Sequence, residues 1–439
     1  MAHRRPRSFD FAVVGAGAAG LAAARVLTSS GASVALFEAR SRVGGRVWAR
    51  PLAGGVADLG AEFIHGRDRH VFEEAETAGL QVLRIADRHV ELRAGVWRPL
   101  THVWRRFDRL TRGIARVRRD RSIAEYIAAR GASLSASDRR LLVSMVEGFD
   151  AAPIEIAGAN AISTAGQPPA DPGERAQFRL ASGWRGYLDW MHARLDPRLC
   201  RVLLATPVRR IAWSSSGARL STDLGEYRTR SVLVTLPVGV LQAAPGTEGA
   251  VQFEPDPPRL RRALAGLAMG DVVRLVLRFR EAFWRKSDSS RRVRRRPEGE
   301  PTFFHVPDGE FPTWWTSSPV ESATLTLWAG GSAARSLLGR GRAEIRRRAL
   351  RTLASSLGVA LPFVRARLLG ADSHDWSGDP FSRGAYSFAR VGGASAGRAL
   401  GQPFGDTLFF AGEAVATDSA GTVTAALASG RRAARRMLR

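Results

Sequence analysis

The opening of the chain is built of apolar runs separated by small and polar residues. Residues 9–14 (FDFAVV) form a short apolar run rich in β-forming side chains, which is typical of a buried parallel strand. Residues 21–30 are rich in alanine and leucine and predict a helix, which Gly31 ends. Residues 33–37 (SVALF) predict a second strand that ends at Glu38. The order strand, helix, strand is that of a nucleotide-binding unit.

Three glycines lie in the turn between the first strand and the helix. Gly15 permits the tight turn, Gly17 lets the backbone approach a pyrophosphate, and Gly20 lets helix and strand pack closely. The pyrophosphate is then stabilised by the free N–H groups and the positive dipole at the start of the helix. This turn predicts a dinucleotide site.

An acidic residue follows the second strand at the position that contacts a ribose. Glu38 lies 18 residues after Gly20, where a carboxylate accepts hydrogen bonds from the hydroxyl groups of an adenosine. Ala39 and Arg40 continue this contact segment. Arg40 raises the alternative of NADP, but Glu38 would repel a 2′-phosphate, so we expect a dinucleotide without one.

The end of the chain repeats the change from strand to helix. Residues 406–414 (DTLFFAGEA) predict an apolar strand that ends in Gly412 and Glu413, and residues 419–423 (SAGTV) lead into a predicted helix over 424–437. Between the two ends of the chain, further strands are predicted at 208–213, 218–222, 226–229, 232–235 and 269–279.

Two segments after the second strand identify the kind of dinucleotide. Gly44-Gly45-Arg46 forms a turn that NAD binding does not need, and residues 58–66 (DLGAEFIHG) follow it. Together with Gly412-Glu413 and the GTV of residues 421–423, these segments resemble the flavin-containing amine oxidase family, which includes the monoamine and polyamine oxidases and the flavin histone demethylases. The resemblance implies FAD as the cofactor.

The resemblance also implies which residues contact FAD. Arg46 gains a charge-assisted contact with the pyrophosphate, and Glu413 hydrogen-bonds the ribityl chain. The helix start at Thr422 and Val423 faces the flavin pyrimidine, where it stabilises the negative charge of the reduced ring. The full set of expected cofactor contacts is Gly15, Gly17, Gly20, Glu38, Ala39, Arg40, Gly45, Arg46, Gly60, Ala61, Glu62, Val208, Trp376, Gly412, Glu413, Thr422 and Val423.

Four side chains are expected on the substrate side of the flavin. Arg274 stands where most relatives carry a lysine that holds a water at flavin N5; an arginine stays protonated and cannot act as a base, so the reaction with oxygen is affected more than flavin binding. Tyr386 forms an aromatic wall, and Thr422 replaces the second aromatic wall, which leaves the cage half open. His65 lies near the substrate, as in polyamine oxidases. An ordinary strand arginine and an ordinary polar histidine are the alternatives for Arg274 and His65.

Two positions predict further properties of the site. Ala385 stands where monoamine oxidases carry a cysteine bonded to the flavin, so FAD is expected to be non-covalent. Glu62 lies in the region where L-amino-acid oxidases carry an arginine for the substrate carboxylate. An acid at this position favours a cationic substrate without a carboxylate, although Arg67 is close in sequence.

The expected fold class is α/β, with two domains of the monoamine and polyamine oxidase kind. The resemblance implies a discontinuous Rossmann-like FAD-binding domain over 1–75, 200–245 and 375–439. It implies an α+β substrate-binding domain with a mixed sheet over 76–199 and 246–374.

Composition excludes several other classes. The chain has 439 residues, of which 45% are hydrophobic and 24% charged, as in soluble globular proteins. No window of about 18 apolar residues, no secretory signal and no C-terminal membrane anchor are found, so a cytoplasmic location is expected. Cys200 is the only cysteine and no HExxH motif occurs, which indicates neither a disulfide framework nor a metal site.

The net charge of +25 has a compositional explanation. Lys286 is the only lysine among 66 basic residues, which indicates a general bias toward arginine. The densest arginine cluster, 291–296, lies in a polar stretch and predicts a solvated loop. Because zinc-finger and RNP-type motifs are absent, no nucleic-acid partner is expected.

The predicted function is the oxidation of a small-molecule amine. Hydride passes from the α-carbon to flavin N5, water hydrolyses the imine, and O2 accepts the electrons to give hydrogen peroxide. One alternative is a related FAD-dependent desaturase or porphyrinogen-type oxidase that acts on carbon–carbon bonds. Another is a flavin-binding protein without turnover, or one that binds nucleic acid through its charge. The sequence specifies neither the amine nor an oligomeric state.

Overall fold

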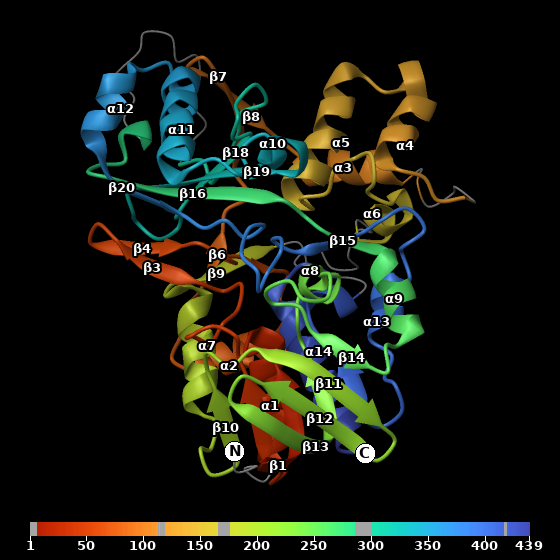
Figure 1. The fold of residues 1–439 in the computed structure, drawn as a ribbon. Helices are drawn as coiled ribbons and strands as arrows, with labels where there is room; N and C mark the ends of the chain where they lie inside the picture. The colour runs from red at the N-terminus through yellow and green to blue at the C-terminus, as the bar shows by residue number, and fades with distance from the viewer. Residues whose placement is uncertain (1–6, 113, 115–118, 166–175, 286–299, 417–418) are drawn as a thin grey trace.

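A computed structural model describes residues 7–112, 114, 119–165, 176–285, 300–416 and 419–439. Lys286 and the arginine cluster at 291–296 lie outside the described residues. The start of β1 (Arg7–Val14) and the C-terminus lie at the same end of the molecule (Figure 1).

The first sheet is built from strands of the beginning, middle and end of the chain. Its parallel part has the order β10-β2-β1-β13-β22. These strands are β1 (Arg7–Val14), β2 (Val34–Phe37), β10 (Cys200–Leu203), β13 (Gly225–Val234) and β22 (Leu408–Phe410). These strands confirm the predictions at 9–14, 33–37 and 406–414. The last of them, β22, is shorter than predicted.

Three helices cover one face of this sheet and share one apolar core. They are α1 (Ala18–Ser29), α7 (Gly183–Ala193) and α14 (Val423–Met437). α1 and α14 approach so closely that a Cβ atom at Gly430 would lie 2.1 Å from the Ala19 carbonyl oxygen. The predicted N-terminal and C-terminal helices thus pack directly on each other.

An antiparallel meander extends the first sheet. It consists of β11 (Val208–Ser214), β12 (Gly217–Thr222) and β13, with β14 (Gln252–Glu254) parallel to β11. The prediction of two separate strands at 226–229 and 232–235 is wrong, because β13 is continuous. One edge of β13 pairs with β12 over its first half and with β22 over its second half, while the other edge pairs with β1.

The second large sheet is mixed and has the order β20-β16-β19-β18-β17-β7-β8. Its only parallel pair within the described residues is β17 with β7. The strands are β7 (His89–Arg93), β8 (Val96–Leu100), β16 (Val272–Phe279), β17 (Phe303–His305), β18 (Thr313–Thr316), β19 (Thr324–Gly330) and β20 (Leu368–Ser373). The predicted strand over 269–279 is divided, because Gly270 and Asp271 separate β15 (Leu267–Met269) from β16.

Helices surround the second sheet in two groups. The first group packs on the sheet core and comprises α10 (Gly331–Arg335), α11 (Arg342–Leu357), α12 (Leu361–Arg367) and a 3₁₀ turn η4 (Phe283–Arg285). The second forms its own core beside the sheet and comprises α3 (Val103–Thr111), α4 (Ile123–Arg130), η2 (Gly131–Ser133), α5 (Ala136–Phe149) and α6 (Ala159–Ala165). The fold is thus α/β with a mixed second sheet, as predicted.

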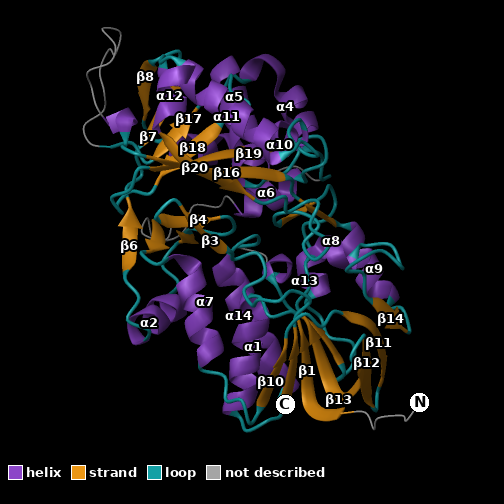
Figure 2. Cartoon of the chain, turned by 60° about the vertical axis from the view of Figure 1, so that its left-hand side comes forward, coloured by secondary structure: helices purple, strands orange, loops and turns teal. Residues whose placement is uncertain are grey.

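Short elements complete the described fold, and among them β3 (Ala49–Leu52) and β4 (Gly55–Asp58) lie between the two large sheets (Figure 2). The strands are β3, β4, β5 (Ile64–His65), β6 (Val82–Ile85), β9 (Gln177–Leu180), and β15 paired with β21 (Ser387–Ala389). The helices are α2 (Arg69–Thr77), α8 (Val238–Leu241), α9 (Pro258–Ala265), α13 (Ala396–Leu400) and η5 (Glu413–Val415).

We propose the predicted two-domain division with two changes. α7 shares the core of α1, and α9 packs in the core beneath the meander with α13. We therefore assign 183–199 and 246–265 to the FAD-binding domain rather than to the substrate-binding domain.

Candidate active site

The turn after β1 has room only for glycine at two positions. Gly15 has φ +106°, and a Cβ atom at Gly20 would lie 1.8 Å from the Gly15 carbonyl oxygen. Gly17 is the N-cap residue of α1, and no side chain caps the free N–H groups there. The start of α1 is therefore available to an anionic group.

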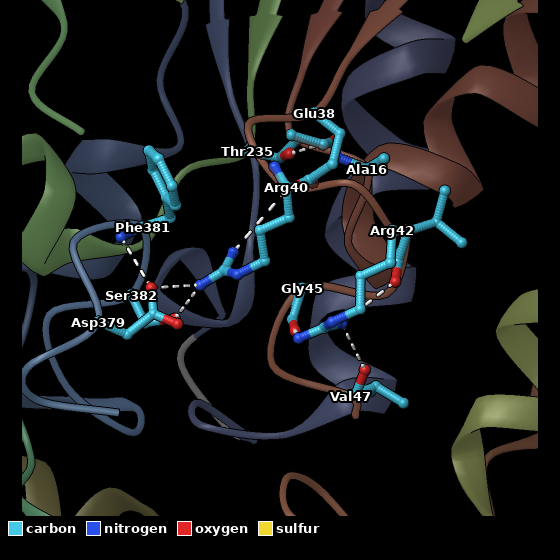
Figure 3. Close-up of polar contacts among 12 residues, drawn as sticks. Ala16, Glu38, Arg40, Arg42, Gly45, Val47, Thr235, Asp379, Phe381 and Ser382 are labelled. Atoms are coloured by element: carbon cyan, nitrogen blue, oxygen red, sulfur yellow. Dashed lines mark hydrogen bonds and ion pairs between the residues drawn. The ribbon is translucent and has the colours of Figure 1, made fainter. Parts of the chain in front are cut away.

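Glu38 fixes this turn from the end of β2 (Figure 3). Its side chain is buried; Oε2 accepts a hydrogen bond from the Ala16 N–H and Oε1 from the Arg40 N–H, both at 2.9 Å. The Thr206 N–H donates to the Glu38 carbonyl, which brings Val208, the first residue of β11, toward the same end of the sheet. The position agrees with that of a ribose contact, which stays a prediction.

Arg40 connects the end of β2 to a distant loop. One guanidinium nitrogen lies 2.7 Å from Asp379 Oδ1 and 2.9 Å from the Ser382 hydroxyl, and the group lies over the Phe381 ring. Burial opposes ionisation of Asp379, but hydrogen bonds from His374 and Arg40 hold its pKa well below the ordinary value. Sequence reasoning missed Asp379, because its partner lies 339 positions away.

Arg42 holds the turn that contains Gly44, Gly45 and Arg46. Its guanidinium donates to the carbonyls of Gly45 (3.0 Å) and Val47 (3.3 Å), as Figure 3 shows. Burial, followed by repulsion from Arg40, lowers its pKa to about 10. Arg42 was also missed by sequence reasoning.

Glu413 gathers the segments expected around the flavin. Arg46 lies 2.9 Å from Oε1, and the Ser387 hydroxyl lies 2.7 Å from Oε2. The Gly421 N–H also donates to Oε2 at 3.2 Å. Arg46 donates in addition to the Ala385 carbonyl at 2.8 Å. The predicted residues Arg46 and Glu413 are therefore in direct contact.

The two glycine-containing turns face each other. A Cβ atom at Gly45 would lie 3.4 Å from the Gly17 Cα atom, so side chains there would fill the space between the turns. Gly60 and Ala61 pack on the Arg46 backbone: a Cβ atom at Gly60 would lie 1.8 Å from its carbonyl oxygen, and the Ala61 N–H donates to the same oxygen at 3.3 Å. A bare backbone at the start of α1 and at the Gly45 turn fits a flavin dinucleotide.

The start of α14 is shaped by Thr422. Thr422 is the N-cap residue; its hydroxyl accepts from the Ala425 N–H and donates to the Ser419 carbonyl. Val423 is the first residue of the helix. Tyr386 packs beside this turn, since a Cβ atom at Gly421 would lie 3.1 Å from its ring. The two predicted wall positions, Tyr386 and Thr422, are thus adjacent.

Arg274 lies in a buried charge cluster. Its guanidinium donates to the Gly60 carbonyl and to Glu62 Oε2, both at 2.5 Å, and lies over the Trp315 ring. Glu62 is bound in addition by Arg179 (2.9 Å) and by the Trp315 indole N–H (2.9 Å). Although burial opposes it, these partners lower the Glu62 pKa.

This cluster changes one expectation. Glu62 was expected to favour a cationic substrate, but its charge is already compensated by Arg179 and Arg274. Arg179 comes from β9, which no local pattern links to the segment of Glu62. Burial and the charge of Glu62 raise the pKa of the neighbouring Asp58 to about 6.

An aromatic cluster adjoins Arg274. It runs from Tyr386 through Trp328, Trp315, Phe63, His65 and Phe149 to Trp104, with ring centroids between 5.4 and 6.4 Å apart. Tyr386 and Trp328 are nearly parallel, with an interplanar angle of 15°. Phe149 keeps an exposed fraction of 44%, so solvent reaches the cluster there.

His65 lies within this aromatic surrounding. Burial lowers its pKa to about 4, so the ring is neutral near neutral pH. Within the described residues, its ring nitrogens have no hydrogen-bond partner. Trp376 is buried and donates its indole N–H to the Leu59 carbonyl at 2.8 Å, which supports the segment from Leu59 to Glu62.

The predicted residues form two groups. One group lies around the carboxyl ends of β1 and β2 and comprises Gly15, Gly17, Gly20, Glu38, Ala39, Arg40 and Val208. The other lies around the aromatic cluster and comprises Arg274, His65, Tyr386 and Thr422. Gly45, Arg46 and Glu413 connect the groups.

The chain is similar to proteins of a known family. A family model described as flavin-containing amine oxidoreductase matches residues 18–183 and 170–438. The chain is similar to lysine-specific histone demethylase 1 homolog 1 of Oryza sativa subsp. japonica, with 28% identity over 97% of this chain and 52% of the relative. It is also similar to polyamine oxidase 2 of Arabidopsis thaliana, with 26% identity over 98% of this chain and 88% of the relative.

A solved structure shares the fold. A putrescine oxidase with bound putrescine superposes with a TM-score of 0.80 and 22% identity, over 98% of this chain and 99% of the other. The chain spans about half the length of the curated demethylases that it matches. Among the described residues, none of the helices has the length and apolar character that a membrane crossing needs.

Proposed function

The chain belongs to the flavin-containing amine oxidoreductase family, and from this premise we propose that it oxidises a small amine with non-covalently bound FAD and passes the electrons to O2. The observation that carries the proposal is the junction of Arg46, Glu413 and the start of α14 next to the aromatic cluster. FAD, when bound, would supply a two-electron acceptor for the oxidation of the amine to an imine.

The chain would hold FAD at both of its ends. The start of α1 would bind the pyrophosphate and Glu38 the adenosine ribose, because the former has free N–H groups and the latter a fixed carboxylate. Arg46 would add a charge-assisted contact to the pyrophosphate. Ala385 cannot form a thioether, which supports release of the cofactor on denaturation.

The substrate side would position the amine. Tyr386 and Trp328 present aromatic faces against which an amine can pack. His65, neutral near neutral pH, would act as a hydrogen-bonding group for the substrate rather than as a strong base. Water that reaches the site would then hydrolyse the imine to a carbonyl compound and ammonia, or to an amine where the substrate is N-alkylated, and O2 would take up the two electrons and two protons as hydrogen peroxide.

Arg274 would act through charge. Its guanidinium cannot accept a proton, and Glu62 and the Gly60 carbonyl fix its orientation. Its Nε atom is buried and has no partner among the described residues. Because protein encloses this atom, Arg274 would influence the site through its charge rather than through a contact of Nε.

An anaerobic substrate panel tests the proposal. The protein loaded with FAD is mixed with monoamines, diamines, polyamines, an N-methylated lysine peptide, amino acids and porphyrinogens, and loss of the oxidised flavin absorbance is followed. Bleaching by an amine, with peroxide formed after air is admitted, is the expected result. Bleaching by porphyrinogens alone would favour the carbon–carbon alternative, and no bleaching at all would favour a flavin-binding protein without turnover.

A further inference from the structure

A carboxylate without a positive partner lies beside the aromatic cluster. Asp150 directly follows Phe149, the last residue of α5, and its N–H donates to the Val146 carbonyl at 3.1 Å. Within the described part of the chain, the Asp150 carboxylate makes no ion pair or hydrogen bond. An unpaired acid is unexpected where 66 basic residues outnumber 41 acidic ones.

The position of Asp150 is fixed by contacts on both sides. The Tyr386 hydroxyl donates to the Phe149 carbonyl at 2.6 Å, and the Trp328 indole N–H donates to the Gly148 carbonyl at 2.8 Å. On the other side, Ala151 is buried with φ +52° and packs against Gly270, whose N–H donates to the Tyr386 carbonyl at 2.7 Å. The turn that carries Asp150 is therefore held against the aromatic wall.

The local electrostatics favour a cation. The last carbonyl groups of α5 carry the negative end of the helix dipole. Burial raises the pKa of Asp150 to about 7, and the Tyr386 pKa is raised first by burial and then by the charge of Asp150. Asp150 is half-buried, and since a carboxylate that is partly removed from water has no partner there, a cation from solution would be stabilised beside it. The faces of Tyr386 and Trp328 would add a cation–π contribution.

Glu62 cannot provide this charge. Both of its oxygens are bound by arginines or by Trp315, whereas the Asp150 carboxylate is free among the described residues. The negative charge that binds a cationic group of the substrate would therefore come from Asp150, in the turn after α5.

We propose that Asp150 binds the second cationic group of a diamine or polyamine substrate, beside Tyr386 and Trp328, while the amine that is oxidised lies at the flavin. This assignment rests on the proposed amine oxidation and adds the substrate class. Asp150 determines specificity and takes no part in bond breaking.

The test compares Asp150→Asn with wild type on a matched pair of substrates, 1,4-diaminobutane and butylamine. The substitution keeps the shape of the side chain and removes its charge. Because the substitution removes a hydrogen bond to a charged group, the kcat/KM for the diamine should fall about 10- to 150-fold. The kcat/KM for butylamine should change less than about 2-fold, within the range of a neutral surface change.

Glu155→Gln is the matched control, since Glu155 is exposed and lies five positions further along the chain. It also removes one negative charge and should change neither substrate. Calorimetric titration of the dithionite-reduced holoenzyme with each amine gives a second readout that needs no turnover, and only the diamine Kd should rise in Asp150→Asn.

If Asp150→Asn lowers kcat/KM by the same factor for both amines, or leaves both values unchanged, the assignment of Asp150 is overturned. If wild type is not reduced by any amine, the proposed function fails instead, and the two Kd values still decide whether Asp150 binds a second cation.

Discussion

Arg46 and Glu413 are 367 positions apart in the sequence and form an ion pair of 2.9 Å. Arg46 belongs to the turn after β2, and Glu413 follows β22 near the other end of the chain. Glu413 also binds Ser387 and Gly421, so one carboxylate connects three segments. This contact brings the segments expected around the flavin to one place.

Glu38→Ala should weaken FAD binding. The Glu38 carboxylate accepts hydrogen bonds from Ala16 and Arg40, and its loss removes both these contacts and the proposed ribose contact. A loss of about 2–3 kcal/mol corresponds to a Kd about 30- to 150-fold higher, so the variant should purify with little flavin. The ratio of flavin to protein absorbance measures this. Glu226→Ala, an exposed carboxylate on β13, is the control; full flavin content in Glu38→Ala would show that the ribose contact is misplaced.

Acid precipitation should release the flavin into the supernatant. Ala385 offers no thiol for a covalent link, and the only cysteine, Cys200, is buried in β10 within the core of α1 and α7. The absorbance of supernatant and pellet is measured after precipitation. Colour that stays in the washed pellet would contradict non-covalent binding.

Arg274→Lys should speed reoxidation of the reduced flavin by O2 in stopped flow. A lysine has a compact ammonium group and cannot bind Gly60 and Glu62 in the same bidentate way, so it is free to hold a water. Arg278→Lys, on the same strand and bonded to Ser322 and Thr324, should leave the rate unchanged. The same rate in Arg274→Lys and wild type would mean that Arg274 does not face N5.

His65 should make the protein less stable in acid. Its folded pKa is lowered to about 4 by burial, below the value of about 6.5 for an unfolded histidine. The unfolded state therefore binds a proton first, and stability is lost as the pH falls from about 6.5 to about 4. His65→Gln removes this contribution. As the pH falls over that range, the Tm of the variant should therefore decrease less than the Tm of wild type.

The exposed His70 provides the control for this measurement. His70→Gln should show the same pH dependence of Tm as wild type, because its ring lies at the surface of α2. A Tm difference for His65→Gln that stays constant with pH would contradict the assignment of a buried, neutral ring.

The local patterns of the sequence predicted much of the fold. The strands around β1 and β2, the helices α1 and α14 and the position of Glu38 were predicted, because apolar periodicity and glycine turns are properties of short segments. β13 was predicted as two strands, since its change of partner from β12 to β22 depends on segments nearly two hundred positions apart.

The site was predicted in part. Arg179, Trp328 and Asp150 were missed, because each gains its role from strands or helices that are not its neighbours in sequence. The ion pair between Glu62 and Arg179 of β9 was not predicted either, so the effect of Glu62 on the substrate stays a prediction. Charge compensation is a property of the tertiary structure and leaves no local pattern.

The central claim is that both ends of the chain bind one FAD molecule, and the absorbance spectrum of the purified protein tests it most directly. The account predicts a flavin band, or its appearance on titration of flavin-free protein with FAD, that saturates at one FAD per chain. A spectrum without this band, together with no uptake of added FAD, would contradict the account.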